Sequence, residues 1–251
     1  MNQKNYFSCL LIGPPGSGKT TAAMTAPGPV LFLDTDIKLH KMVLAQTKLS
    51  SGEVVQWAID DPMTSLSLTA LMKVDMKPGS KAVMPKPKGY EHLAEMIDKL
   101  VEGKCVVDGV KYETVVLDSF TSMSEHLVRY ITAANSSPHM TLPLYGTLKT
   151  NFEILISTLM RLPANIIIIC HESATKDELT GRISYKPLIE GGMKDKIGKD
   201  FEEIYYMEKT ISGDKCKYEM LTVGNSMKDC RTSRALPSKV EPNFRKIYGY
   251  E

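Results

Sequence analysis

The segment Gly13-Pro14-Pro15-Gly16-Ser17-Gly18-Lys19-Thr20 decides how the rest of the chain is interpreted. It follows the apolar run Cys9-Leu10-Leu11-Ile12 and leads into Thr21-Ala22-Ala23-Met24, an order typical of strand, tight loop and helix start. The G-x-x-x-x-G-K-[ST] spacing predicts a phosphate-binding loop, because its glycines allow successive backbone N–H groups to turn inward. The following helix adds the positive end of its dipole. We therefore expect the segment from Gly13 to Thr21 to bind a nucleotide, and we expect that nucleotide to be ATP.

Two side chains of this segment have predicted roles of their own. Lys19 supplies a positive charge to the β- and γ-phosphates, and the Thr20 hydroxyl is a ligand for Mg²⁺. The alternative is a surface turn rich in Gly and Pro that happens to precede Lys-Thr. Such turns rarely stand between a buried strand and a helix, so the sequence favours the phosphate loop.

Composition limits the class of protein. The 251 residues, 43% of them hydrophobic, suit a single large α/β domain over residues 1–251 rather than two full domains. Thirty-one Lys+Arg against 29 Asp+Glu leave a formal net charge of +2, so any contact with nucleic acid must be a local patch. The five cysteines have no C-x-x-C spacing, which argues against a disulfide framework or a zinc site. Without a leader pattern or a long apolar run, we expect a cytoplasmic protein with no membrane contact.

Three apolar runs end in polar residues. Val30–Leu33 leads to Asp34 and Asp36, Thr114–Leu117 leads to Asp118, and Asn165–Cys170 leads to His171 and Glu172. Because the carboxyl ends of parallel strands meet at one edge of a sheet, we expect these side chains to share a site with the phosphate loop. An acid in the position of Asp118 would hold the Mg²⁺ shell beside Thr20. Asp34 or Asp36 could instead simply cap a helix beginning near residue 38, and the choice between them stays open.

The alternation of strands and helices predicts an open, mostly parallel α/β sheet flanked by helices. Two last strands, expected at 201–207 and 217–223 with a turn at 212–214, would add antiparallel edge strands near the C-terminus. Helices are expected at 90–103, 124–134 and 145–160. Residues 60–89 are basic and contain prolines, and we expect them to form an insertion or mobile loop, either a solvated linker or a flap that contacts nucleic acid. Residues 173–200 are expected to form a second long loop.

The acid motif resembles one class of phosphate-loop proteins. Classical AAA+ ATPases place Asp-Glu at the end of the Walker B strand, whereas this chain has Asp118-Ser119, which resembles the RecA-like class. By this resemblance the fold is a RecA-like P-loop NTPase core. Asp36 stands where such enzymes keep the acid that activates water, with Asp in place of the usual Glu. His171 stands where they keep a polar residue, often Gln, that senses the γ-phosphate.

The whole chain looks like the phage-encoded RecA-like, AAA-type ATPases, a family that includes single-strand annealing recombinases. The matching segments run from Leu11 through Asp36, Asp118-Ser119 and Ile168–Glu172 to Phe201–Tyr205 and the basic tail. The resemblance implies single-stranded DNA as ligand, homo-oligomers, and a basic residue that acts on the neighbouring subunit's ATP site. Lys228, Arg231 and Arg234 are candidates for that residue, the alternative being an ordinary solvated tail. A bacterial host cell is then the compartment.

The leading hypothesis is a Mg²⁺-dependent ATPase of phage DNA recombination or replication that binds single-stranded DNA in a nucleotide-dependent way. A single-strand-binding or other replication protein is a possible further partner. The predicted DNA contact combines phosphate-binding cations with Tyr185 as a stacking platform. The candidate contact residues are Arg182, Tyr185, Lys186, Lys194, Lys196 and Lys199. The alternatives are a nucleotide-gated interaction module with little hydrolysis, and a small-molecule kinase.

Overall fold

The computed structural model describes residues 6–37, 39, 54–59 and 87–249. The predicted insertion at 60–89 lies outside these residues except for its last three. The elements of the described part are β1 (Ser8–Gly13), α1 (Lys19–Met24), β2 (Val30–Asp34), β3 (Val54–Ala58), α4 (Gly89–Glu102), β4 (Val106–Val107), β5 (Val110–Lys111), β6 (Thr114–Asp118), α5 (Phe120–Ala134), α6 (Leu142–Leu159), β7 (Asn165–Lys176), β8 (Ile183–Pro187), the 3₁₀ helices η1 (Gly191–Asp195) and η2 (Ile197–Asp200), β9 (Glu203–Ser212), β10 (Lys215–Leu221), β11 (Lys239–Val240) and α7 (Phe244–Tyr248).

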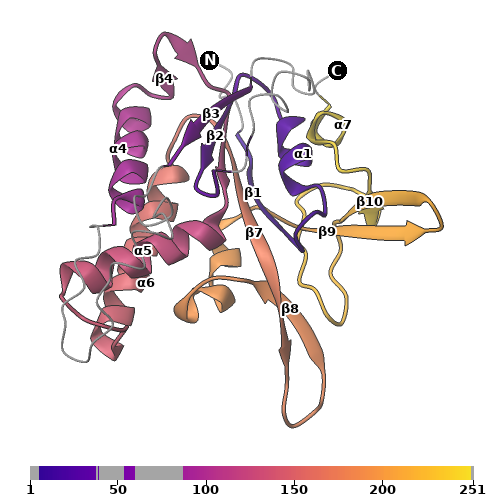
Figure 1. The fold of residues 1–251 in the computed structure, drawn as a ribbon. Helices are drawn as coiled ribbons and strands as arrows, with labels where there is room; N and C mark the ends of the chain where they lie inside the picture. The colour runs from indigo at the N-terminus through magenta and orange to yellow at the C-terminus, as the bar shows by residue number, and fades with distance from the viewer. Residues whose placement is uncertain (1–5, 38, 40–53, 60–86, 250–251) are drawn as a thin grey trace.

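One large sheet forms the centre of the molecule, in the order β11-β10-β9-β1-β7-β6-β2-β3 (Figure 1). The strands from β9 to β3 in this order are parallel to one another, whereas β10 and β11 are antiparallel additions at one edge. The predicted fold class is therefore confirmed. The parallel order also brings the carboxyl ends of β1, β2, β6 and β7 to the same edge of the sheet, as expected from the polar residues that follow the apolar runs.

Alternate residues of the central strands fill two separate cores. Leu10 and Ile12 of β1 face the layer of α4, α5 and α6, whereas Cys9 and Leu11 face α1 and α7. Figure 1 shows α4, α5 and α6 on one side of the sheet and α1 and α7 on the other. Helices on both faces explain why the strands read as continuous apolar runs, since neither face of the sheet meets water.

Two predicted helices begin earlier than expected. The prediction placed one start at Ser124, but α5 begins at Phe120, because the Ser119 hydroxyl accepts the Ser122 N–H (3.3 Å) and caps the helix. The other, α6, begins at Leu142 rather than Tyr145. Pro143 lies in its first turn, where the missing N–H costs no hydrogen bond.

The prediction of a long loop over 173–200 was wrong. Strand β7 continues past the sheet edge to Lys176 and pairs with β8 in an antiparallel hairpin, from Glu172 opposite Pro187 to Lys176 opposite Ile183. The segment after it forms η1 and η2. Figure 1 shows this hairpin projecting from the body, away from both termini. The apolar alternation in β8 is confined to Ile183, Tyr185 and Pro187, which is too short a pattern to predict a strand by itself, and the end of β7 after His171 has no such alternation.

Candidate functional site

The phosphate loop joins β1 to α1 and depends on glycine at defined points. A Cβ added at Gly13 would lie 2.8 Å from the Met207 carbonyl oxygen, closer than such atoms approach. Gly16 and Gly18 have φ values of +71° and +87°, a left-handed conformation that other residues rarely adopt. These glycines therefore shape an open loop ahead of the α1 N-terminus, which is the cradle that a phosphate chain requires.

Lys19 is buried under this loop. Its Nζ donates to the carbonyl oxygens of Gly13 (2.9 Å) and Pro14 (2.8 Å), so the ammonium is held at the base of the cradle. Burial lowers the pKa of Lys19, and the charges of Asp118 and Glu172 oppose this effect. A phosphate entering the loop would meet this cation at the base of the cradle.

Thr20 and Asp118 form the candidate magnesium site. The Thr20 hydroxyl donates to Asp118 Oδ2 across 2.6 Å, which joins the start of α1 to the end of β6. Burial raises the pKa of Asp118 to about 6; Thr20 opposes this shift, and the charges of Asp36 and Asp34 add to it. Carboxylates crowded near a hydroxyl suit a divalent cation. Phosphates and water supply the other ligands of Mg²⁺, so it fits a site with one direct carboxylate.

Asp34 and Asp36 have different environments. The Asp34 carboxylate is fully buried and accepts hydrogen bonds from the backbone N–H groups of Asp36 (3.0 Å) and Leu39 (3.0 Å) and from Gln56 Nε2 (2.8 Å). Asp36 is half-buried and accepts from the Ser119 hydroxyl (3.2 Å) beside Asp118. Asp34 therefore stabilises the turn after β2. The geometry favours Asp36 as the acid that can act on a water molecule.

His171 lies at the carboxyl end of β7, directly opposite Gly13 of the phosphate loop in the β1–β7 pairing. Its backbone N–H donates to the Thr121 hydroxyl (3.0 Å), so α5 fixes the strand end. Together with Lys19, Thr20, Asp36 and Asp118, His171 lines a cavity of about 600 Å³. The structure therefore brings these five predicted residues to one cavity.

Sequence analysis missed an aromatic wall of this cavity. Tyr218 of β10 lies against Gly18, where an added Cβ would be 3.4 Å from the Tyr218 Cδ1. Met24, Leu39 and Pro242 line the cavity as well. A phosphate-binding loop next to an apolar, aromatic surface can hold both parts of a nucleotide. No local signal marks Tyr218, because its place depends on the pairing of β10 with β9 and of β9 with β1.

A second missed feature is a cluster of charges behind His171. Lys228 Nζ lies 3.2 Å from Glu208 Oε1 and 3.8 Å from Glu172 Oε2, and its side chain is only 11% exposed. The rings of Tyr185 and Tyr206 have centroids 5.2 Å and 5.5 Å from the same nitrogen. Burial raises the pKa of Glu172, and the charges of Lys228 and Lys19 oppose the rise. Lys228 is therefore no residue of a solvated tail, because it neutralises carboxylates within its own chain.

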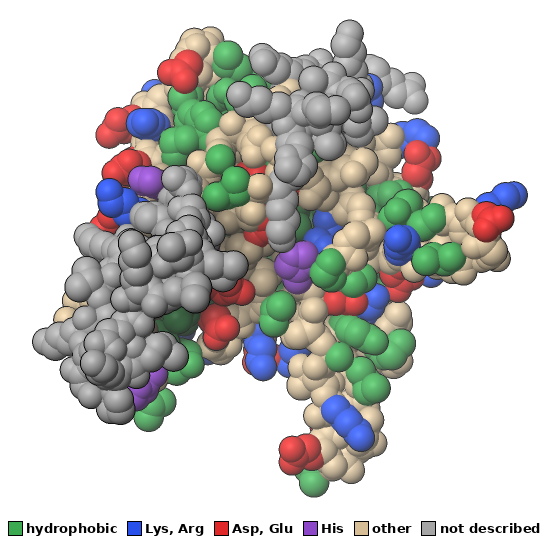
Figure 2. All heavy atoms as spheres, viewed as in Figure 1, with side chains coloured by type: hydrophobic (Ala, Val, Ile, Leu, Met, Phe, Trp, Pro, Cys, Tyr) green, Lys and Arg blue, Asp and Glu red, His purple; other side chains and the backbone are tan. Residues whose placement is uncertain are grey.

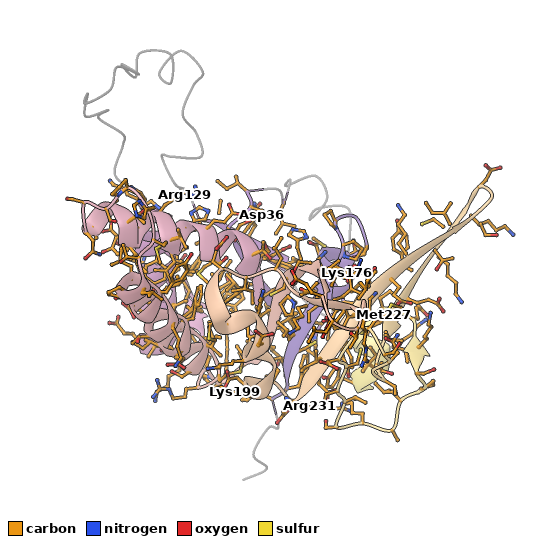
Figure 3. All side chains as sticks on the ribbon, turned by 90° about the horizontal axis from the view of Figure 1, so that it is seen from below. Asp36, Arg129, Lys176, Lys199, Met227 and Arg231 are labelled. Carbon is orange, nitrogen blue, oxygen red and sulfur yellow. The ribbon has the colours of Figure 1, made fainter. Side chains whose placement is uncertain are left out.

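The other two candidates for a residue acting in trans also have partners in their own chain. Arg231 donates to the carbonyl oxygens of Gly198 (2.7 Å) and Phe201. The Arg234 guanidinium lies 3.9 Å from the centroid of the Tyr248 ring. In Figure 3, Arg231 lies on the opposite side of the molecule from Asp36, so it does not belong to this chain's own cavity.

The candidate DNA contacts are dispersed. Arg182 donates its Nε to the Ser226 carbonyl (2.9 Å), and Tyr185 is half-buried under Lys228. Lys186 is paired with Asp195. Lys196 and Lys199 are exposed on the 3₁₀ segment, with Lys194 half-buried beside them. The three lysines of η1 and η2 thus form the most accessible basic group of this set, and Tyr185 has one neighbour already over its ring.

A glycine-shaped loop, a buried lysine and a Thr–Asp pair beneath a parallel sheet edge define a P-loop nucleotide-binding domain. The chain belongs to the AAA domain family (AAA_24), whose model matches residues 5–239. A KaiC-like protein from the hyperthermophilic archaeon Pyrococcus horikoshii OT3 matches with 13% identity and a TM-score of 0.43, over 94% of this chain and 87% of that one. No curated protein matches the sequence. Among the helices that the structure describes, none is long and apolar enough to cross a membrane.

Proposed function

We propose that this chain is a Mg²⁺-dependent ATPase of phage DNA recombination or replication that binds single-stranded DNA in a nucleotide-dependent way. The observation that carries the proposal is the convergence of Lys19, Thr20, Asp36, Asp118 and His171 on one cavity at the carboxyl edge of the sheet. The phage setting and the DNA ligand rest on the family resemblance of the sequence.

In this mechanism the chain supplies charge and position rather than covalent chemistry. Backbone N–H groups of the phosphate loop and Lys19 bind the phosphates, and the base rests against Tyr218. Thr20 and Asp118 would hold Mg²⁺, which when bound would neutralise phosphate charge. Asp36 orients the attacking water through its carboxylate, held by Ser119. His171 lies within the same cavity, where it detects the γ-phosphate.

The candidate DNA surface consists of Lys194 of η1, Lys199 of η2 and Lys196 between them. Strand β7 connects it to the cavity, because the hairpin begins one residue after His171 and Lys186 of β8 is paired with Asp195 of η1. A change at His171 would therefore reach these lysines through paired strands, and this is the proposed link between nucleotide and DNA binding.

The deciding experiment is steady-state ATP hydrolysis with and without single-stranded DNA, with Lys19→Ala to subtract contaminating activity. We expect DNA to stimulate hydrolysis and Lys19→Ala to abolish it. Turnover that depends on an added nucleoside monophosphate would instead indicate a kinase. ATP binding with neither turnover nor DNA affinity would refute the proposal.

The DNA surface has its own test, in which Lys194, Lys196 and Lys199 are changed together to Ala. If these lysines contact phosphates, the slope of log K against log salt becomes shallower by about 2, at about 0.7 for each contact with a single strand. The matched control changes Lys99, Lys104 and Lys111, three exposed lysines at the far end of α4 and on β5. An equal effect of both triple variants would show that only overall charge matters.

The second candidate function is a nucleotide-gated interaction module that binds ATP and hardly hydrolyses it. The short Asp36 in place of the usual Glu favours it, and so does the exposed leucine at the end of the projecting hairpin, where Leu179 is 97% exposed. Nucleotide-dependent assembly without DNA affinity would support this candidate.

A further inference from the structure

The hairpin formed by β7 and β8 ends in an ordered turn that presents a leucine to solvent. We call residues 172–187 the arm and residues 177–182 its tip. Asp177 Oδ1 accepts the backbone N–H groups of Leu179 (2.9 Å) and Thr180 (2.8 Å), and the Gly181 N–H donates to the Asp177 carbonyl (2.8 Å). The backbone at Leu179 is thus ordered while its side chain is 97% exposed, with Glu178 beside it.

Arg182 anchors the tip to the body. Its guanidinium donates to the Ser226 carbonyl, and the Tyr185 N–H of the arm donates to the Met227 carbonyl (2.8 Å) in the same loop. Figure 2 shows the arm as a separate projection with acidic and hydrophobic side chains at its end. An apolar side chain on an ordered turn can act as an interface anchor, because the backbone loses little conformational entropy on binding.

A second cavity lies at the amino end of the sheet, and we call it the amino-end pocket. It has a volume of about 990 Å³ and an apolar floor that includes Phe7, Met160 and Leu162. The Phe7 ring stacks on Tyr248 with centroids 3.9 Å apart, which makes one wall flat and aromatic. The pocket is therefore wide enough and apolar enough to receive a leucine-bearing turn.

The rim of the amino-end pocket has charges that complement the tip. Arg231 and Arg234 lie on it, and neither forms an ion pair with any carboxylate that the structure describes. Asp200, Glu202 and Glu203 line the same pocket. The tip offers Asp177 and Glu178 next to Leu179, with Arg182 at its base. Each sign of charge on the tip thus finds the opposite sign on the rim.

The arm cannot enter the pocket of its own chain. The arm extends β7 beyond its carboxyl end, whereas Ala164 and Ile166 at the amino end of the same strand line the pocket. Two complementary surfaces at opposite ends of one molecule make a head-to-tail contact, which repeats as a ring or a filament.

We propose that the arm tip of one copy of this chain docks into the amino-end pocket of the next copy, with Leu179 as the apolar anchor. The contact does not depend on the proposed ATPase activity or on DNA, because both surfaces are formed in the chain without nucleotide.

The test is sedimentation velocity over a range of protein concentrations, with and without ADP. The wild-type chain should associate as concentration rises. Leu179→Asp should weaken association at least about 30-fold, the effect expected for loss of an interface anchor. The matched control is Ile211→Asp near the tip of the β9–β10 hairpin, where the side chain is 68% exposed, and this variant should associate as the wild type does.

A mixing experiment tests the head-to-tail geometry. Arg234→Glu alters the pocket and leaves the arm intact, whereas Leu179→Asp alters the arm and leaves the pocket intact. Each variant alone should be monomeric, and an equimolar mixture should form dimers but nothing larger, because only one arm and one pocket remain able to pair.

Three outcomes would overturn the proposal: a monomeric wild type under all conditions, a Leu179→Asp variant that associates normally, or two folded variants that do not dimerise when mixed. Circular dichroism checks that Arg234→Glu folds. If it does not, the mixing experiment is replaced by sedimentation of Glu178→Lys alone, a solvent-exposed arm substitution that should also weaken association. A failure here with normal DNA-stimulated hydrolysis would refute the contact and leave the ATPase proposal standing.

Discussion

Asp118 should destabilise the empty protein, and replacing it by Asn should make the fold more stable. Burial raises the pKa of Asp118 from 3.8 to about 6, so the folded state binds a proton more tightly than the unfolded state does. Stability from this group is therefore highest at low pH and is lost as the pH rises through about 6. The interval between the two pKa values corresponds to a loss of about 3 kcal/mol in the free energy of unfolding at pH 7.5. Solvent screens this effect little, because Asp118 is only 8% exposed.

Asn keeps an oxygen that accepts from the Thr20 hydroxyl but carries no charge, so Asp118→Asn should remove this penalty. We expect its melting temperature at pH 7.5, without Mg²⁺ or nucleotide, to exceed that of the wild type by about 6 to 12 °C. By the same linkage the advantage should fall to roughly half at pH 5 and vanish near pH 3. Hydrolysis of ATP should drop at least about 100-fold, because Mg²⁺ loses its carboxylate.

Thermal unfolding followed by circular dichroism at the three pH values tests this reasoning, with hydrolysis measured in parallel. Asp98→Asn, which removes an exposed carboxylate from α4, is the control for a general effect of net charge and should leave the melting temperature nearly unchanged. An Asp118→Asn variant no more stable than the wild type at pH 7.5, or an advantage independent of pH, would refute the account of a buried, charged carboxylate.

Three further predictions follow from the site. Mg²⁺-dependent nucleotide affinity should fall about tenfold per pH unit below about 6, because Mg²⁺ competes with a proton for Asp118; calorimetric titrations that show no break there would contradict this. Tyr218→Ala should weaken binding of a fluorescent ATP analogue about 5- to 10-fold while Tyr218→Phe binds normally, since the ring face provides the contact; equal losses would point to the hydroxyl. Lys228→Met should lower the free energy of unfolding by about 3 kcal/mol in urea titrations, because Glu172 and Glu208 lose a buried cation. Adding Glu172→Gln should restore part of that loss, and no recovery would argue against the pairing.

The sequence predicts the parallel sheet and the contents of its carboxyl edge because both depend on local patterns. Apolar runs such as Val30–Leu33 identify strands buried on both faces, and the sheet then necessarily brings their polar ends together. The choice between Asp34 and Asp36 lies beyond such patterns. It depends on Gln56 of β3, which donates to Asp34 from a neighbouring strand and so commits that carboxylate to the fold.

The features missed by sequence analysis depend on contacts between distant segments. Tyr218 reaches the phosphate loop only because β10 pairs with β9 and β9 with β1. In the sequence, Lys228 is one of several cations of a basic tail. In the fold, it lies between Glu172 and Glu208. The arm was expected to be a loop because its apolar alternation covers only the five residues of β8, and the pairing of β8 with β7 determines the hairpin. In each case the pairing of strands, rather than residue type, determines the environment.

Strand β7 connects the nucleotide cavity directly to the arm, because it contains both His171 and the first strand of the arm. Its residue His171 lies opposite Gly13 of the phosphate loop, and the next residue, Glu172, faces Lys228 and begins the arm. A displacement of this strand end toward a γ-phosphate would alter the Glu172–Lys228 distance and tilt the paired strands beyond it. Because Arg182 and the Tyr185 N–H hold the other strand of the arm to the Ser226 and Met227 carbonyls, such a displacement would strain the arm at its base. The surfaces of the head-to-tail contact are formed without nucleotide, so a bound nucleotide would act on that contact only through this base.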